Sequence, residues 1–212
     1  AGNGIIAIDF DKNMKFNYFV ACVNGNLYGF DHTGSALPGW NPNSGVGVVE
    51  HPVRHFQFEG KDFIVALNTS AKLHVFGRNG QPRFSPVALS GRFASPPQVD
   101  ANARTPRIVC FNTLGKAFVC NTEGTVFSLQ LGKGNQKSLG ILAPISGDNR
   151  LDYAILQDNK LVASAYKGNA IQTVFSTQLP GKQDTIFEIE GIRIGSLHRE
   201  KNQIFLLDNK GN

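Results

Sequence analysis

The sequence lacks a long apolar segment, because no apolar run approaches the roughly 18 residues that a membrane-spanning helix needs. It also lacks a basic block: its 21 Lys and Arg residues are scattered singly. No window therefore predicts binding to nucleic acid or to a lipid surface. A single methionine and few helix-forming runs argue against a helical protein. With 17% charged and 41% hydrophobic residues, the chain can build a real core, and the composition argues against disorder.

The three cysteines, Cys22, Cys110 and Cys120, are an odd count without CxxC spacing. Buried, reduced cysteine is the simplest interpretation. Cys110 and Cys120 flank one predicted hairpin, whose register places them opposite Phe118 and Ile108 rather than opposite each other. A disulfide there is therefore disfavoured but open, and the redox compartment stays undetermined.

A turn that ends in glycine follows an apolar strand five times. The glycines lie 46, 44, 44 and 43 residues apart and are Gly34, Gly80, Gly124, Gly168 and Gly211. Two strand-like segments precede each turn, joined by a short polar turn such as Asn24-Gly25-Asn26, which suits a tight hairpin. The middle segments are near-continuous apolar runs, as in strands that are covered on both faces. A small antiparallel sheet repeated every 40 to 50 residues predicts a β-propeller.

We therefore expect an all-β chain forming a single β-propeller domain of about five four-stranded antiparallel blades. The repeats should span about 1–46, 47–92, 93–136, 137–180 and 181–212. The last blade should be incomplete, because its outer strand does not follow Gly211. Either five blades close imperfectly, or they are part of a larger ring completed by further sequence. We favour the larger ring, because an unpaired edge strand invites aggregation.

The first repeat carries a recognisable pattern. It runs from Ala7-Ile8-Asp9-Phe10-Asp11 through Gly25-Asn26-Leu27-Tyr28-Gly29-Phe30-Asp31 to Leu37-Pro38-Gly39-Trp40. This pattern resembles an FG-GAP/VCBS repeat, the type found in integrin-like propellers and in bacterial secreted proteins. The resemblance implies an extracytoplasmic protein, whether secreted, periplasmic or on the cell surface. In the other four repeats only the strands and the glycine turn match.

The acidic loop of the first repeat corresponds to the loop that binds calcium in that family. Oxygen ligands at alternate positions of a tight loop can converge on one hard cation at about 2.3–2.6 Å. The side chains of four residues and the backbone carbonyl of Lys15 would be the ligands, the four being Asp9, Asp11, Asn13 and Asn17. Only two carboxylates are present, and neighbouring lysines weaken cation binding. The alternative is a structural turn in which Asp9 and Asp11 accept backbone N–H groups.

Other chemistry is sparse in the sequence. It contains no GxSxG elbow, no HExxH and no phosphate-binding glycine loop, so no catalytic residue is assigned. Trp40, the one tryptophan, could stack on a sugar at the propeller rim, but the resemblance favours packing between blades. No cofactor other than calcium is expected.

The leading hypothesis is a non-catalytic module that binds a protein or glycan, or acts as a scaffold, within a larger extracytoplasmic protein. The alternative is a carbohydrate-active enzyme of the same fold, a polysaccharide lyase or glycosidase with its site in the central funnel. A purely structural spacer is a third interpretation. Clustered Asp, Glu, His or Arg side chains with a well-formed cleft in the funnel would favour the enzyme, and an apolar or bland funnel would favour the module.

Overall fold

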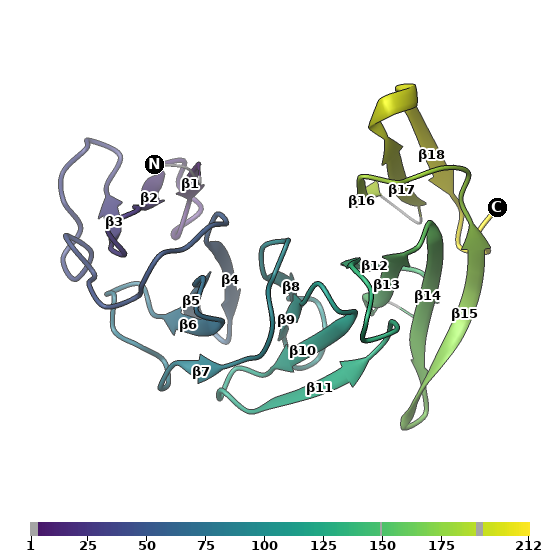
Figure 1. Ribbon diagram of the computed structural model, residues 1–212. Helices are drawn as coiled ribbons and strands as arrows, with labels where there is room; N and C mark the ends of the chain where they lie inside the picture. Colours follow the sequence, from purple (N-terminus) through teal and green to yellow (C-terminus); the bar gives the residue numbers. More distant parts are fainter. Residues whose placement is uncertain (1–3, 149, 190–192) are drawn as a thin grey trace.

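A computed structural model describes residues 4–148, 150–189 and 193–212. These residues form five antiparallel sheets and one short 3-10 turn, η1 (Arg199–Lys201). The five sheets follow one another around an arc, with the first and the fifth at its two ends (Figure 1). Within the described ranges, no helix has the length and hydropathy needed to cross a membrane.

The first and fifth sheets have three strands each. They are β1 (Ile5–Ile8), β2 (Asn17–Ala21) and β3 (Leu27–Phe30), and β16 (Thr185–Ile189), β17 (Arg193–His198) and β18 (Gln203–Leu207).

The second, third and fourth sheets have four strands each. They are β4 (Arg54–Phe58), β5 (Lys61–Leu67), β6 (Lys72–Phe76) and β7 (Val87–Ala88); β8 (Gln98–Asp100), β9 (Arg107–Phe111), β10 (Lys116–Cys120) and β11 (Val126–Gln130); and β12 (Ser138–Ala143), β13 (Asp152–Gln157), β14 (Lys160–Lys167) and β15 (Ala170–Gln178).

The predicted all-β propeller fold is confirmed, and each sheet takes its strands from one of the five ranges that the glycine turns predict. The first sheet differs from the predicted four strands. Its outer segment makes only two isolated bridges, Leu27 with Asn43 and Phe30 with Ala36. Pro38 lies in this segment and has no N–H to donate, which keeps a regular fourth strand from forming. In the fifth sheet the described residues supply no outer strand, as predicted.

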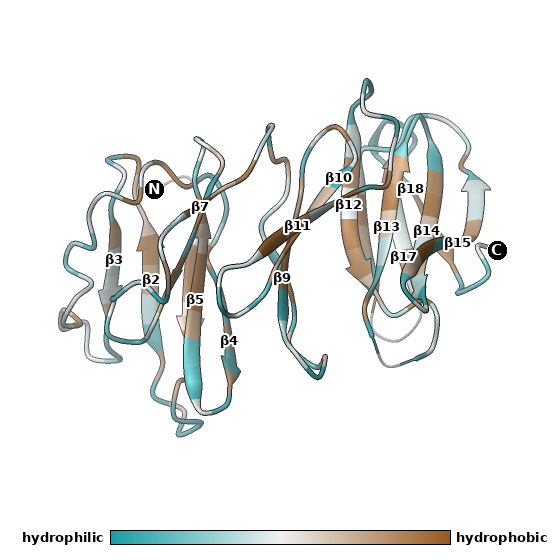
Figure 2. Cartoon of the chain, turned by 90° about the horizontal axis from the view of Figure 1, so that it is seen from below, coloured by the Kyte–Doolittle hydropathy of each residue, from teal (hydrophilic) through white to brown (hydrophobic). Residues whose placement is uncertain are grey.

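In the second, third and fourth sheets the middle strands β5, β9 and β13 are buried on both faces, because these sheets have a neighbour on each side. In β5, Ile64 and Ala66 pack into the core shared with the first sheet. The alternate residues Phe63, Val65 and Leu67 pack into the core shared with the third sheet. Figure 2 shows hydrophobic residues concentrated along such strands and hydrophilic residues in the loops at their ends. This two-sided burial explains the continuous apolar runs of the sequence.

The cysteine prediction is confirmed for the β9–β10 hairpin. Cys110 pairs with Phe118, and Cys120 pairs with Ile108. All three cysteines are free. Burial raises the pKa of the Cys120 thiol to about 11, and burial raises the pKa of Cys110 further. Both thiols therefore stay protonated and unreactive at neutral pH.

Successive turns of each sheet lie alternately on two opposite faces of the arc. The hairpins between second and third strands lie beside the linkers that join successive sheets. Backbone hydrogen bonds connect them, from Thr69 to Val48 (2.8 Å), from Thr113 to Arg92 (2.7 Å) and from Leu179 to Asn159 (2.8 Å). We call this edge the hairpin–linker face, and the edge that holds the remaining hairpins the opposite face.

Candidate functional site

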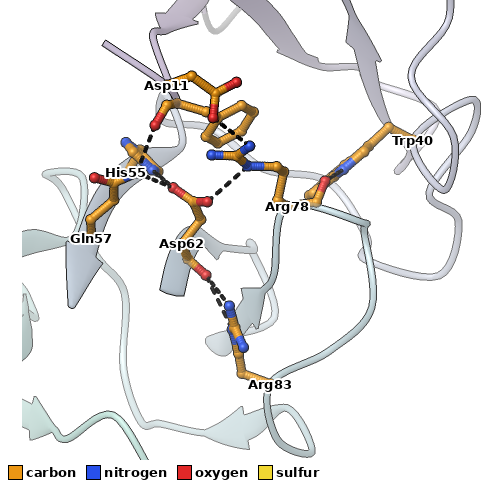
Figure 3. A network of polar contacts seen from close by, with 8 residues as sticks. Asp11, Trp40, His55, Gln57, Asp62, Arg78 and Arg83 are labelled. Carbon is orange, nitrogen blue, oxygen red and sulfur yellow. Dashed lines mark hydrogen bonds and ion pairs between the residues drawn. The ribbon is translucent and has the colours of Figure 1, made fainter. Parts of the chain in front are cut away.

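Asp62, near the start of β5, is the centre of a polar network between the first two sheets (Figure 3). Its side chain is 6% exposed. One carboxylate oxygen accepts hydrogen bonds from His55 Nε2 (2.8 Å) and Gln57 Nε2 (3.0 Å). The other accepts one from Arg78 Nε (2.9 Å). Arg83 donates to the Asp62 backbone carbonyl (2.7 Å). The buried charge is therefore paired and hydrogen-bonded on both oxygens, as a buried carboxylate must be.

Arg78 extends this network to the first sheet. Its Nη1 donates to Asp11 Oδ1 at 2.7 Å, and its guanidinium carbon lies 4.6 Å from the centre of the Phe10 ring. The Arg78 carbonyl accepts a hydrogen bond from Trp40 Nε1 at 2.7 Å. Gln57 donates to the Phe10 carbonyl at 2.8 Å. One arginine thus joins two blades through charge, ring and backbone contacts.

The electrostatics of this network agree with its geometry. Burial alone would raise the pKa of Asp62, but the hydrogen bonds from His55, Gln57 and Arg78 outweigh it and lower that pKa. Burial likewise opposes the charge of Arg78, yet its contacts with Asp11 and Asp62 raise its pKa. Asp62 and Arg78 are therefore a fixed ion pair at neutral pH.

Trp40 packs between the first two blades, as the sequence favoured. Its side chain is fully buried. Its ring makes edge-on contacts with Phe19, at 4.9 Å between centroids, and with Phe76, at 5.4 Å. Phe19 belongs to the first sheet and Phe76 to the second, so Trp40 packs the two sheets together.

Four of the five predicted metal ligands lie in the loop between β1 and β2, and the fifth, Asn17, begins β2. They contact different partners. The Asp9 carboxylate accepts the backbone N–H groups of Asn13 (3.1 Å) and Met14 (2.8 Å). Asn13 Oδ1 accepts the Lys15 N–H at 2.9 Å. The Asp9 part of the loop is therefore the hydrogen-bonded turn of the alternative interpretation.

The other two predicted side-chain ligands are drawn away from this turn. Asp11 pairs with Arg78 of the second sheet instead of with backbone N–H groups. Asn17 begins β2, where it pairs with Ile8. Across the described residues, no group of three His, Cys, Asp or Glu side chains is placed to hold a metal ion. Calcium binding at this loop stays a prediction.

A cavity of about 580 Å³, which we call the axial cavity, lies against the first strands of the second to fifth sheets, β4, β8, β12 and β16. Its lining includes apolar side chains such as Phe187 and polar side chains, some of which already have partners. Arg54 Nε donates to the Pro97 carbonyl at 3.2 Å, and His55 bonds to Asp62. Glu188 is the one acidic side chain among the described lining residues. The described residues that line the axial cavity therefore include no pair of carboxylates of the kind that glycoside hydrolysis uses.

A second buried network joins the third and fourth sheets. Arg107 donates from Nε (3.0 Å) and Nη2 (2.8 Å) to one oxygen of Asp100, from Nη1 to the Tyr153 hydroxyl (2.9 Å), and to the Leu151 carbonyl. The Asp100 side chain is 1% exposed, and its Oδ1 has no hydrogen-bond partner among the described residues. Burial raises the pKa of Tyr153, so its hydroxyl stays neutral.

Sequence reasoning did not predict either network. The only signal was an acidic residue beside an apolar strand, as in Lys61-Asp62-Phe63, which also fits an exposed strand end. The partners come from distant positions, since Asp11 and Arg78 are 67 residues apart.

No protein-family model matches the chain, and no curated protein matches its sequence. Solved structures do match. The structure of BBS1N in complex with ARL6DN, soaked with lead, superimposes with a TM-score of 0.68 at 11% identity, covering 96% of this chain and 60% of that one. The same complex soaked with mercury gives a TM-score of 0.67 at 9% identity, with 95% and 63% covered.

BamB from Moraxella catarrhalis also matches, with a TM-score of 0.56 at 15% identity, covering 100% of this chain and 66% of that one. The chain thus spans 60% to 66% of the length of these three structures. At these identities the likeness shows the β-propeller fold alone.

Proposed function

We propose that the chain is a non-catalytic β-propeller module that binds a protein or glycan partner. The observation that carries this proposal is that polar side chains at the axial cavity make hydrogen bonds within the propeller. Arg54 and His55 are both held by contacts within the propeller. Both contacts stabilise the propeller itself, and the described lining residues include one acidic side chain, Glu188, so they offer no carboxylate pair for glycoside hydrolysis.

The matched structures support a protein partner. BBS1N is a propeller of similar fold that was crystallised in complex with ARL6DN. Fold likeness does not transfer that partner to this chain. It supports the more general proposal that the loops of this propeller are a binding surface.

We also keep two proposals that depend on the resemblance of the first repeat to FG-GAP/VCBS repeats: an extracytoplasmic location within a larger protein, and calcium at the Asp9 loop. Calcium would have to compete with Arg78 for Asp11, which lies 2.7 Å from that guanidinium. A thermal-shift titration with calcium and EDTA tests the metal. No shift at millimolar calcium would remove calcium from the proposal.

The module and the enzyme are distinguished by turnover. We expect saturable binding on glycan arrays or to protein partners, and no release of reducing or unsaturated ends from a panel of polysaccharides and glycosides. We expect Glu188→Gln to leave binding unchanged, because Glu188 lies in strand β16 at the axial cavity and the proposed binding surface is made of loops. Turnover that disappears in Glu188→Gln would favour the enzyme instead.

A further inference from the structure

Four neighbouring cavities lie along the hairpin–linker face. Their volumes are about 360, 490, 520 and 350 Å³. The first and second share Arg92 and Phe93, the second and third share Lys137, and the third and fourth share Gln157 and Asp158. These four cavities, which we together call the linker groove, lie at the joints from the second sheet to the fifth.

Basic side chains outnumber acidic ones along the linker groove. Five basic residues line it, namely Arg92, Lys133, Lys137, Lys160 and Lys182. All five are exposed, and none belongs to the ion pairs found among the described residues. In the sequence they are isolated single charges. The repeat brings them to one edge because hairpins and linkers recur on the same face of every blade.

The backbone under these charges is fixed. Gln157 Nε2 donates to the carbonyls of Lys133 (3.0 Å) and Gln136 (2.8 Å), and its Oε1 accepts the Lys133 N–H (2.7 Å). Asn112 Nδ2 donates to the Ser90 carbonyl at 3.1 Å in the preceding joint. The groove is thus formed before any partner arrives, which lowers the entropic cost of binding.

The composition of the groove distinguishes between anionic partners. Apolar side chains contribute to its lining, including Leu114, which is 43% exposed, and Phe93. Three acidic side chains interrupt the basic ones, namely Glu50, Asp158 and Asp184. A uniform polyanion such as nucleic acid would meet repulsion at each acidic side chain. A protein segment that mixes acidic and apolar residues can avoid them and place apolar groups in the cavities.

We propose that the linker groove docks an acidic, partly apolar segment of a partner protein. This proposal rests on the proposed function, because it names the class of partner that the module binds. The contact would be sensitive to salt, since exposed charges attract through solvent that ions screen.

The test uses three probes: a fluorescein-labelled peptide in which Glu alternates with Leu, polyglutamate of the same length, and a DNA duplex of equal charge. The variant protein carries Lys133→Glu, Lys137→Glu and Lys182→Glu. Its matched control carries the same charge change on the opposite face, as Lys61→Glu, Lys167→Glu and Lys210→Glu. All six lysines are exposed, and unfolding curves check that both proteins are folded.

We expect the wild type to bind the Glu–Leu peptide more tightly than polyglutamate or DNA. The groove variant should bind it at least about tenfold more weakly, while the control should lose only the small long-range part. Equal loss in both variants, no peptide binding by the wild type, or a preference for DNA would each overturn the proposal. These outcomes differ from polysaccharide turnover, which alone would overturn the module.

Discussion

Two blade joints use the same pair of residue types under different conditions. Between the first and second sheets, Asp62 shares its charge among His55, Gln57 and an Arg78 side chain that is 45% exposed. Between the third and fourth sheets, Asp100 depends on Arg107, which is 16% exposed. From this difference we expect that the loss of unfolding free energy on breaking an Asp–Arg pair depends on how buried the pair is. It should also depend on how many other hydrogen-bond donors the aspartate keeps.

The largest effect is expected at the deeper joint. Arg107→Ala leaves the Asp100 carboxylate buried without a cation, which should destabilise the protein by about 3–5 kcal/mol. Urea unfolding followed by tryptophan fluorescence measures the loss. Tyr153→Phe is the control, because it removes one neutral hydrogen bond and should cost about 1 kcal/mol. A loss in Arg107→Ala no larger than that of Tyr153→Phe would contradict the comparison.

A smaller effect is expected at the first joint. Asp62→Ala removes the acceptor of three donors, but Arg78 can reach solvent, so the expected loss is about 1–3 kcal/mol. The same urea titration measures it. If Asp62→Ala costs more than Arg107→Ala, then burial does not rank the two joints.

The pH dependence tests the Asp62 charge directly. The pKa of Asp62 in the folded protein lies below its ordinary value. Its contribution to stability is therefore complete above the pKa of the unfolded chain and is lost as pH falls through the lowered folded pKa. We expect a flatter acid decline of the unfolding free energy below about pH 4 in Asp62→Asn than in the wild type. The exposed Asp158→Asn is the control and should keep the wild-type slope.

The smallest effect is expected at the rim of the first joint. Asp11 and Arg78 are 59% and 45% exposed, so solvent screens their attraction. Asp11→Asn should cost no more than about 1 kcal/mol and should lose this effect in high salt. A double-mutant cycle with Arg78→Gln measures the coupling energy. A coupling of several kcal/mol would place the strength of this joint at its rim rather than at Asp62.

Local patterns in the sequence predicted much of the fold. The glycine turns predicted five sheets, the continuous apolar runs predicted the two-sided burial of the middle strands in the second to fourth sheets, and the hairpin register placed Cys110 opposite Phe118. The prediction of a fourth strand in the first sheet was wrong, because the segment around Pro38 forms only isolated bridges. These successes and this failure all concern residues close together in the chain.

The sequence by itself determined the repeat, because the residues that form the turns and the buried strands lie within each unit of about 44 residues. Only the tertiary structure decided which charges meet. Asp11 reaches Arg78 of the next blade, and Arg107 reaches Tyr153 of the following one. The single lysines of the linker groove also share a surface only after the blades stack. Interactions between repeats depend on how one sheet sits against the next, and no pattern within one repeat encodes that geometry.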